Sequence, residues 1–231
     1  MGGPVSYSHR DSIALIKMDD GKVNVLGPTM QQGLNQALDQ ADSDAVKALV
    51  ISGNDRVFSG GFDLKVLTSG QAQPAIDMLR GGFELAYRIL SSPRPVVMAC
   101  TGPAIAMGAF LLTSGDHRVA AHGYSIQANE VAIGMTIPYA ALEILKLRLT
   151  PSAYQQATGL AKTFFGETAL AAGFVDEIAL PEMVLSRAEE AAQELAGLHS
   201  HAHAATKLRA RAEALKAIRA GIDGIESEFG L

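Results

Sequence analysis

Apolar residues along the chain follow two periods, one typical of strands and one typical of helices. Short continuous apolar runs bounded by turn residues predict buried strands, and apolar residues three and four positions apart predict amphipathic helices. The predicted strands are Val5–Ser8, Ile13–Met18, Val46–Ile51, Val96–Ala99 and Phe174–Ile178. A short extended piece, Val23–Leu26, follows the second of them.

Helical patterns separate these strands and fill the last third of the chain. Predicted helices begin near Pro28, Gly108 and Pro151, and another ends at Leu147. Three more span about 74–90, 181–196 and 204–229. Pro28 suits a first helical turn, and Thr29 and Gln32 have the spacing of a capping box. This alternation predicts an α/β fold, and its loosely repeated strand–strand–helix rhythm indicates a spiral of similar units. We divide the chain into a core, residues 1–180, and a helical C-terminal region, residues 181–231.

The segment from Gly102 to Glu130 combines several of these patterns. It opens with a Gly-Pro turn, continues as an apolar helix and is expected to return as a short pair of strands. It ends on a lone carboxylate, Glu130, in apolar company. A glycine-rich turn that enters a helix offers backbone N–H groups, and a lone acid offers a proton acceptor. These are the groups needed to form and quench an enolate.

Composition narrows the class of protein. With 231 residues, 48% of them hydrophobic, the chain can bury a sizeable core and is slightly rich in apolar residues for a monomer, which indicates subunit contacts. A net charge of −5 argues against a nucleic-acid partner. The single cysteine, Cys100, excludes an internal disulfide framework and fits a reducing compartment.

No segment predicts export or membrane insertion. The N-terminus lacks the apolar stretch of a secretory signal. The longest apolar run, Pro95–Ser114, is interrupted by Gly102-Pro103 and therefore predicts a strand and a helix start, not a membrane span. We expect a cytoplasmic protein without a membrane partner.

Two groups of polar side chains in the last third are open to several interpretations. His199, His201 and His203 alternate in an expected linker without a cysteine or carboxylate at metal-binding spacing, so we expect surface histidines and no metal site. The basic residues of the expected last helix suit phosphates, a neighbouring subunit or a solvated face equally well. These residues are Lys207, Arg209, Arg211, Lys216 and Arg219.

Three segments resemble motifs of one superfamily. They are FSGGFDLK from Phe58 to Lys65, PVVMACTGPAIAMG from Pro95 to Gly108, and AKTFFGETALAAGFVD from Ala161 to Asp176. In order and spacing they resemble the crotonase (enoyl-CoA hydratase/isomerase) superfamily, from about Val5 to Phe229. The resemblance implies a ββα spiral and a helical C-terminal trimerisation region. It also implies homotrimers that often pair into hexamers, acyl-CoA thioester substrates, and no cofactor apart from the coenzyme A of the substrate.

The resemblance also implies an oxyanion hole made of two backbone N–H groups. One belongs to Phe62, before the motif aspartate, and the other to Met107, at the middle position of the family's G-G-G. Ala106 replaces the first glycine, a departure that a backbone donor tolerates. The alternative is that the glycines only serve tight turns. Two such donors suit the charge that develops on a thioester oxygen.

The same resemblance bears on the reaction. Hydratases of the superfamily use two glutamates, and this chain has Phe110 at one of the two positions and Glu130 at the other. A single base beside an oxyanion hole suits the transfer of a proton from C2 to C4 of a 3-enoyl thioester. The Asn129-Glu130 pair, with Pro138 downstream, resembles the Δ3,Δ2-enoyl-CoA isomerase branch. If Glu130 is buried and unpaired, its pKa should be raised; if it is a solvated turn acid, it has no such role.

Other residues of these motifs are assigned supporting roles. Asp63 is expected to brace its loop and cap the next helix. Lys22 and Lys65 are candidate ligands of coenzyme A phosphates or simply solvated lysines. The residues expected to contact the substrate are Lys22, Val23, Val25, Gly60, Gly61, Asp63, Leu64, Phe110 and Pro138.

The leading hypothesis is therefore an enoyl-CoA isomerase in which Glu130 moves the proton and the amides of Phe62 and Met107 hold the oxyanion. Two alternatives stay open. One is an enoyl-CoA hydratase-like enzyme of fatty-acid degradation, and the other is a non-catalytic acyl-CoA-binding homologue.

Overall fold

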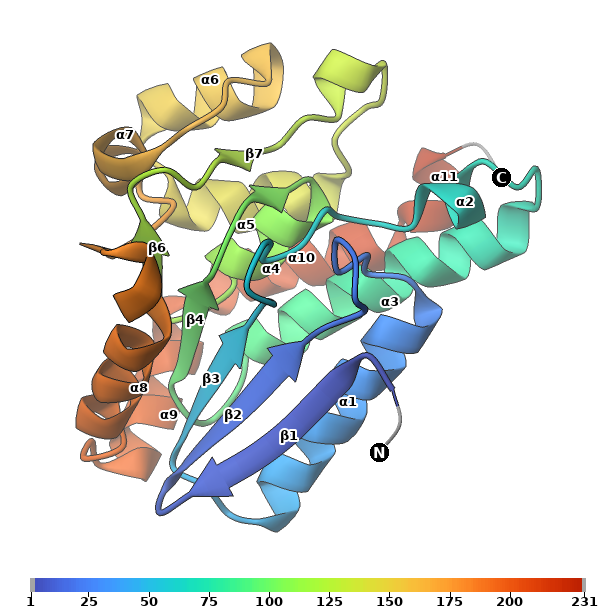
Figure 1. Cartoon of the computed structure of the whole chain (residues 1–231). Helices are drawn as coiled ribbons and strands as arrows, with labels where there is room; N and C mark the ends of the chain where they lie inside the picture. The colour runs from blue at the N-terminus through green and yellow to red at the C-terminus, as the bar shows by residue number, and fades with distance from the viewer. Residues whose placement is uncertain (1–2, 230–231) are drawn as a thin grey trace.

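A six-stranded sheet forms the centre of the molecule, in a computed structural model that describes residues 3–229. Its order is β1-β2-β3-β4-β6-β8; β1 is antiparallel to β2, and every other neighbouring pair is parallel (Figure 1). Parallel neighbours require crossover connections, which here contain helices. The strands are β1 (Val5–Arg10), β2 (Ile13–Met18), β3 (Ala48–Ser52), β4 (Val96–Cys100), β6 (His117–Ala121) and β8 (Glu177–Ala179).

Helices cover both faces of this sheet. One face packs against α8 (Val184–Leu195), whose Ala188 and Ala192 let the helix approach the strands closely. The other face packs against helices that follow three of the strands. These are α1 (Pro28–Ser43), α3 (Ala72–Leu90) and α4 (Met107–Thr113). Because both faces are covered, every residue of β3 and β4 is buried, which explains their continuous apolar runs.

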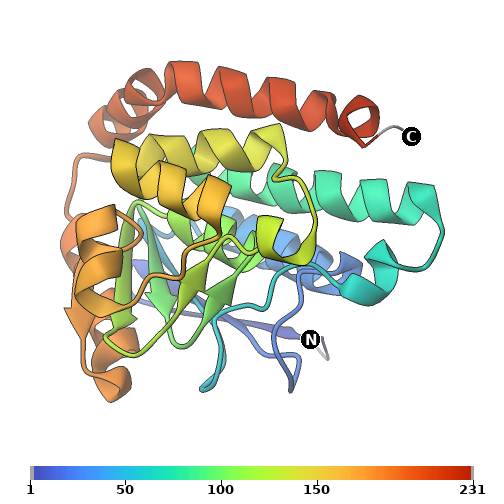
Figure 2. The same cartoon turned by 90° about the horizontal axis from the view of Figure 1, so that it is seen from above.

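The C-terminal helices form an outer layer. Figure 2 shows α10 (Ala212–Asp223) lying over α5 (Tyr139–Arg148) and α3, on the side away from the sheet. The remaining helices are α2 (Leu64–Leu67), α6 (Pro151–Leu160), α7 (Gly166–Ala172), α9 (Ser200–Ala210) and α11 (Ile225–Glu228), and single 3-10 turns span Val131–Ile133 and Pro181–Met183. No helix within residues 3–229 is both long and apolar enough to cross a membrane.

The α/β class and the main elements agree with the expectations from sequence, and four details are corrected. The predicted strand pair after α4 does not exist as a pair: β6 joins the main sheet, whereas β7 (Ile126–Gln127) pairs with β5 (Ala104–Ile105). The last strand begins three residues later than predicted, since Phe174 and Val175 are core residues. No side chain caps α1, so the capping box is absent.

The fourth correction concerns the expected last helix, which is three helices with junctions at Arg211 and Gly224. As a result, His201 and His203 lie in α9 and not in a linker, and His199 is the residue that caps it. Among residues 3–229, no group of three histidine, cysteine or acidic side chains is arranged to hold a metal ion. The role of residues 181–231 in oligomerisation stays a prediction.

Candidate active site

Four chain segments meet in a small layer beyond the carboxyl ends of the central strands. Leu26 N donates to Gly61 O at 2.7 Å, which joins residues 23–26 to residues 59–62. Ile105 N donates to the Ser59 carbonyl at 2.9 Å, which adds residues 104–107. The pairing of β5 with β7 then adds the segment that continues to Glu130. The layer therefore brings together the segments to which the sequence assigned site residues, apart from α2, the part of α4 that carries Phe110, and the start of α5.

The two amides predicted to form the oxyanion hole lie on adjacent segments of this layer. A Cβ atom built on Gly61 would lie 3.4 Å from Met107 N, so the chain before Phe62 passes directly beside the Met107 amide. Met107 is the first residue of α4, where an N–H has no partner within the helix. Within residues 3–229, neither Phe62 N nor Met107 N donates a hydrogen bond. Both amides are thus available to an acceptor.

The residue before Met107 holds an unusual backbone conformation. Ala106 has φ 51° and ψ −124°, a region that residues other than glycine rarely occupy. Its N–H donates to the Gln127 carbonyl at 2.8 Å, which fixes the turn against β7. The departure from the glycine of the family motif is therefore tolerated at a cost in backbone strain, and the strain lies beside the Met107 amide.

Glu130 lies three residues after β7 and is buried, with 6% of its surface exposed. Its Oε2 atom is buried with no hydrogen-bond partner among the described residues. Burial raises the pKa of this carboxyl from 4.5 to about 7, and its own backbone N–H lowers the pKa by a smaller amount. Among residues 3–229, no charged side chain contributes to this shift, and burial is its main cause. The solvated-turn alternative for this residue is excluded.

Phe110 lies one turn after Met107 on α4 and is 1% exposed. Its ring stacks on Phe83 of α3 at a centroid distance of 6.3 Å, and the rings of Phe83 and Phe62 form a T-shaped pair at 6.0 Å. The three rings form an apolar column beside the turn that carries the Phe62 amide. The phenyl group at the position of a hydratase glutamate is thus a packed core residue; direct contact with a substrate stays a prediction.

The loop that carries Lys22, Val23 and Val25 is fixed by a residue that sequence reasoning did not assign to the site. Asn24 is fully buried with φ 51°, and its Nδ2 atom donates to the carbonyls of Met18, Val57 and Phe58. Lys22 and Val23 are left exposed at the loop surface, and Val25 is half-buried. An asparagine after a tight turn was the available signal, since this residue type tolerates the left-handed conformation.

The other predicted site residues lie around the same layer. Asp63 caps α2 by accepting a hydrogen bond from Lys65 N at 2.9 Å, as expected, while Leu64 is exposed at the start of that helix. Gly60 lies in the layer itself, where its N–H donates to the Val23 carbonyl at 2.8 Å. Pro138 is buried and precedes α5, at the end of the loop that begins at Glu130.

The basic residues near the C-terminus are largely engaged within the chain. Lys207 and Arg211 both bind Asp116, and Arg219 binds Glu84 and lies over the ring of Tyr87. The expectation that these side chains only form a solvated helix face is therefore wrong for Lys207, Arg211 and Arg219, three of the five basic residues.

Comparisons with known proteins identify the family of this chain. The sequence profile described as "Enoyl-CoA hydratase/isomerase" matches residues 8–226. A putative enoyl-CoA hydratase of Thermus thermophilus is 31% identical over 224 residues, which cover 95% of this chain and 85% of the relative.

Two solved structures are much more similar in sequence. A probable enoyl-CoA hydratase from Mycobacterium tuberculosis is 82% identical with a TM-score of 0.98, over 99% of this chain and 97% of that chain. An apo structure of the Mtb enoyl-CoA isomerase is 80% identical with a TM-score of 0.96, over 99% of this chain and 100% of that chain. With the matched profile and the shared fold, these similarities confirm the predicted crotonase architecture, and the chain belongs to the enoyl-CoA hydratase/isomerase family.

Proposed function

We propose that this family member is a Δ3,Δ2-enoyl-CoA isomerase. The observation that carries the proposal is the state of Glu130, a buried carboxyl whose Oε2 atom has no hydrogen-bond partner among residues 3–229. A general base works best when its pKa is close to the working pH, and a pKa of about 7 meets this condition. A single such group can both accept and return one proton.

The reaction needs no second reactant. The Glu130 carboxylate takes a proton from C2 of a 3-enoyl thioester, and the C2 electron pair moves into the carbonyl to give an enolate. The N–H groups of Phe62 and Met107 donate to the enolate oxygen, where each donor is worth about 3 kcal/mol. The protonated Glu130 then delivers the proton to C4, and the double bond moves from C3–C4 to C2–C3.

Phe110 supports isomerisation over hydration. Addition of water requires a group that positions the water and a group that handles its second proton. At the place of the second glutamate, the structure has a ring packed on Phe83. An apolar neighbourhood also keeps water away from the enolate, which favours the return of the proton at C4.

Enoyl-CoA hydratase activity is the second candidate, because several similar proteins carry that name. The two candidates differ in product. Purified protein is incubated separately with a 3-enoyl-CoA and a 2-enoyl-CoA, and the products are separated. We expect a 2-enoyl-CoA from the first substrate and negligible 3-hydroxyacyl-CoA from the second. The opposite pattern would establish the hydratase.

The role of Glu130 is tested by Glu130→Gln, for which we expect isomerisation to fall by about 10²–10⁴-fold. Glu167→Gln, which alters an exposed acid on α7, is the matched control and should keep the wild-type rate. A Glu130→Gln rate close to wild type would remove Glu130 from the mechanism. Tight binding of coenzyme A esters without turnover of either substrate would favour a non-catalytic acyl-CoA-binding protein.

Homotrimers or pairs of trimers are also part of the proposal. Exposed apolar side chains on the surface support subunit contacts, among them Leu160 with 74% and Ile133 with 53% of their surface exposed. Light scattering after gel filtration distinguishes monomer, trimer and hexamer.

A further inference from the structure

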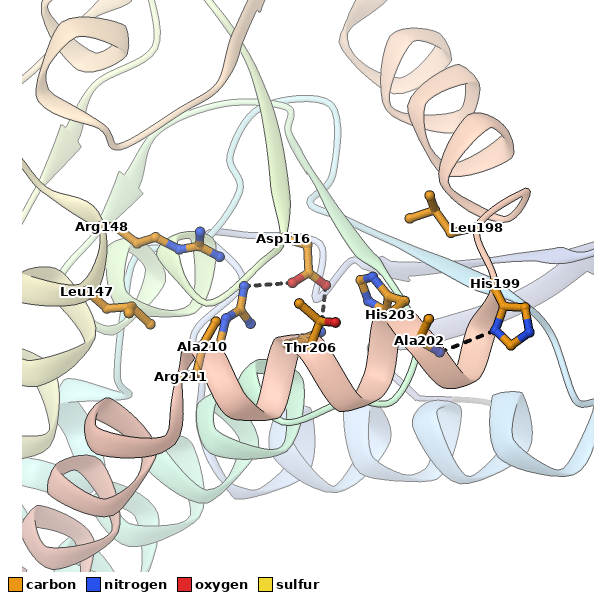
Figure 3. Close-up of a pocket in the computed structure, with 11 residues that line it drawn as sticks. Asp116, Leu147, Arg148, Leu198, His199, Ala202, His203, Thr206, Ala210 and Arg211 are labelled. Atoms are coloured by element: carbon orange, nitrogen blue, oxygen red, sulfur yellow. Dashed lines mark hydrogen bonds and ion pairs between the residues drawn. The ribbon is translucent and has the colours of Figure 1, made fainter.

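A second polar pocket lies at the opposite end of the central strands from the catalytic layer. Asp116 immediately precedes β6 and accepts a hydrogen bond from Val96 N, at the start of β4. The candidate active site follows Cys100, at the other end of β4. At about 3.3 Å per residue, the two ends are roughly 13 Å apart along the strand. The pocket, of about 710 Å³, opens between α9, the end of α5 and the start of β6 (Figure 3).

Among residues 3–229, the side chains that line this pocket include three cations and one carboxylate. Lys207 Nζ and Arg211 Nη2 bind the two oxygens of Asp116 at 2.6 and 2.7 Å. The guanidinium of Arg148 lies on the facing side, where Figure 3 shows it directed toward Asp116 and Arg211. It donates to the carbonyls of Thr113 and Gly115 and has no carboxylate within ion-pair distance in residues 3–229. The lining therefore carries a net charge of about +2 when all four groups are ionised.

This positive charge is held in a partly dry environment. The Lys207 side chain is 4% exposed, and its burial lowers its pKa to about 8 despite the ion pair with Asp116. Burial, and then the charges of Arg118 and Arg211, lower the pKa of Arg148 to about 10. A carboxylate or phosphate at this place would offset both effects.

Three polar side chains without a resolved positive charge also line the pocket: His199, which caps α9, His203 and Thr206. The Nε2 atom of His203 is buried with no hydrogen-bond partner among the described residues. The exposed Thr206 lies one turn along α9 from Ala202, on the same wall of the pocket (Figure 3). Buried polar atoms in proteins normally have hydrogen-bond partners. The polar side chains on α9 therefore offer further hydrogen-bonding groups to a ligand beside the cations.

We propose that this pocket binds the phosphate group of a small molecule. A phosphate dianion matches the net charge, and its several oxygens can accept from donors that converge from α5 and α9. Guanidinium groups are suited to this geometry, because the planar fork presents more than one N–H to the same oxyanion. The site uses none of the residues assigned to the enoyl chemistry, so its test does not depend on the outcome of the isomerase proposal.

Calorimetric titration with inorganic phosphate, against chloride at equal ionic strength, tests the site. We expect saturable binding of phosphate that weakens at least tenfold in Arg148→Gln. Arg209→Gln is the matched control, because Arg209 is exposed on α9 outside the pocket lining, and it should bind phosphate as wild type does. Absence of phosphate binding in the wild-type protein, or equal binding by Arg148→Gln, would overturn the proposal.

A second variant covers the possibility that Arg148→Gln does not fold, since Arg148 also holds two carbonyls at the end of α4. Ala202→Glu leaves these bonds intact and adds a carboxylate to the exposed wall of the pocket. We expect it to abolish phosphate binding. Phosphate binding with unchanged affinity in Ala202→Glu would place the anion elsewhere on the protein and refute the site. Binding of succinate in preference to phosphate by the wild type would likewise overturn the assignment to phosphate.

Discussion

The backbone of Gly61 lies directly against the turn that presents the Met107 amide. A Cβ atom at Gly61 would come within 2.9 Å of both the Ala106 Cβ and the Ile105 carbonyl oxygen, and within 3.4 Å of Met107 N. Gly61 also has φ +93°, in the left-handed region that favours glycine. The spacing between the two proposed oxyanion donors therefore depends on the absence of a side chain at this residue.

Gly61→Ala should separate the two segments and misplace at least one donor. We expect kcat for 3-enoyl-CoA isomerisation to fall by about 100-fold, which is the effect of losing one oxyanion donor. Gly70→Ala is the matched control, since Gly70 has φ +75° with open space around it. It shares the backbone strain without the clash, so it should lose stability and keep its activity. Equal loss of activity in both variants would contradict the role of the Gly61 contact.

Ala106→Gly should stabilise the protein, against the usual direction of an alanine-to-glycine change. The strained φ of 51° costs on the order of 1–3 kcal/mol, whereas the added freedom of glycine in the unfolded chain costs about 0.5–1 kcal/mol. We expect a net gain of about 1 kcal/mol in urea denaturation. Ala109→Gly, within α4, should instead lose about 1 kcal/mol or more. Destabilisation of similar size in both variants would show that Ala106 carries no strain.

The elements that could be predicted from sequence are those whose signal is local. Strands β3 and β4 show continuous apolar runs because helices cover both of their faces, and α3 shows the helical period because one of its faces is buried. The junction at Arg211 could not be predicted, because nothing in the sequence there forbids a helix. Arg211 and its partner Asp116 are 95 positions apart, so the ion pair exists only in the folded chain.

In the candidate site, too, the residues with a local sequence signal could be predicted and those that depend on tertiary contacts could not. Glu130 and the glycine turns could be found because their spacing matches a family motif. The burial of Phe110 against Phe83 could not be found, because that contact joins two helices through tertiary packing. The role of Asn24 was also missed, since its hydrogen bonds to Val57 and Phe58 reach more than 30 positions along the chain.

The burial of Phe110 determines the outcome that we expect for the variant Phe110→Glu. At this 1% exposed position, replacing the ring by a carboxylate removes the stacking on Phe83, and burying the charged group costs free energy because it loses its water. We expect a loss of at least 3 kcal/mol in the free energy of unfolding and no gain of hydratase activity. Phe110→Leu should fold with a smaller loss and keep isomerase activity. A folded Phe110→Glu protein that hydrates 2-enoyl-CoA would show instead that residue 110 faces the substrate.

The pH dependence of catalysis should report the pKa of Glu130. Only the carboxylate form can accept the C2 proton, and burial raises the pKa of this group to about 7. We therefore expect kcat/KM for a 3-enoyl-CoA to be constant above about pH 8 and to fall tenfold per pH unit below about pH 6. Initial rates between pH 5 and pH 9 test this. A profile that stays flat down to about pH 5 would contradict a buried, unpaired base.

The raised pKa of Glu130 also makes the ionised form of this residue destabilising for the folded protein at neutral pH. Because its pKa is about 7 in the folded protein and 4.5 in the reference state, the folded protein binds the proton more tightly. The stability contributed by this group is fully present below about pH 4.5 and is lost as the pH rises to about 7. A difference of about 2.5 pH units corresponds to about 3 kcal/mol.

Glu130→Gln should consequently be more stable than the wild type at pH 8, by up to about 3 kcal/mol, while it loses isomerase activity. The advantage should shrink as the pH falls from 7 toward 4.5, since the wild-type carboxyl becomes neutral in the folded state first. Urea denaturation of both proteins at pH 5 and pH 8 measures the change, and Glu167→Gln, at an exposed position, should stay within about 0.5 kcal/mol of wild type at both. If Glu130→Gln is equally stable or less stable than wild type at pH 8, the ionised carboxylate must find partners in solution that compensate for its burial.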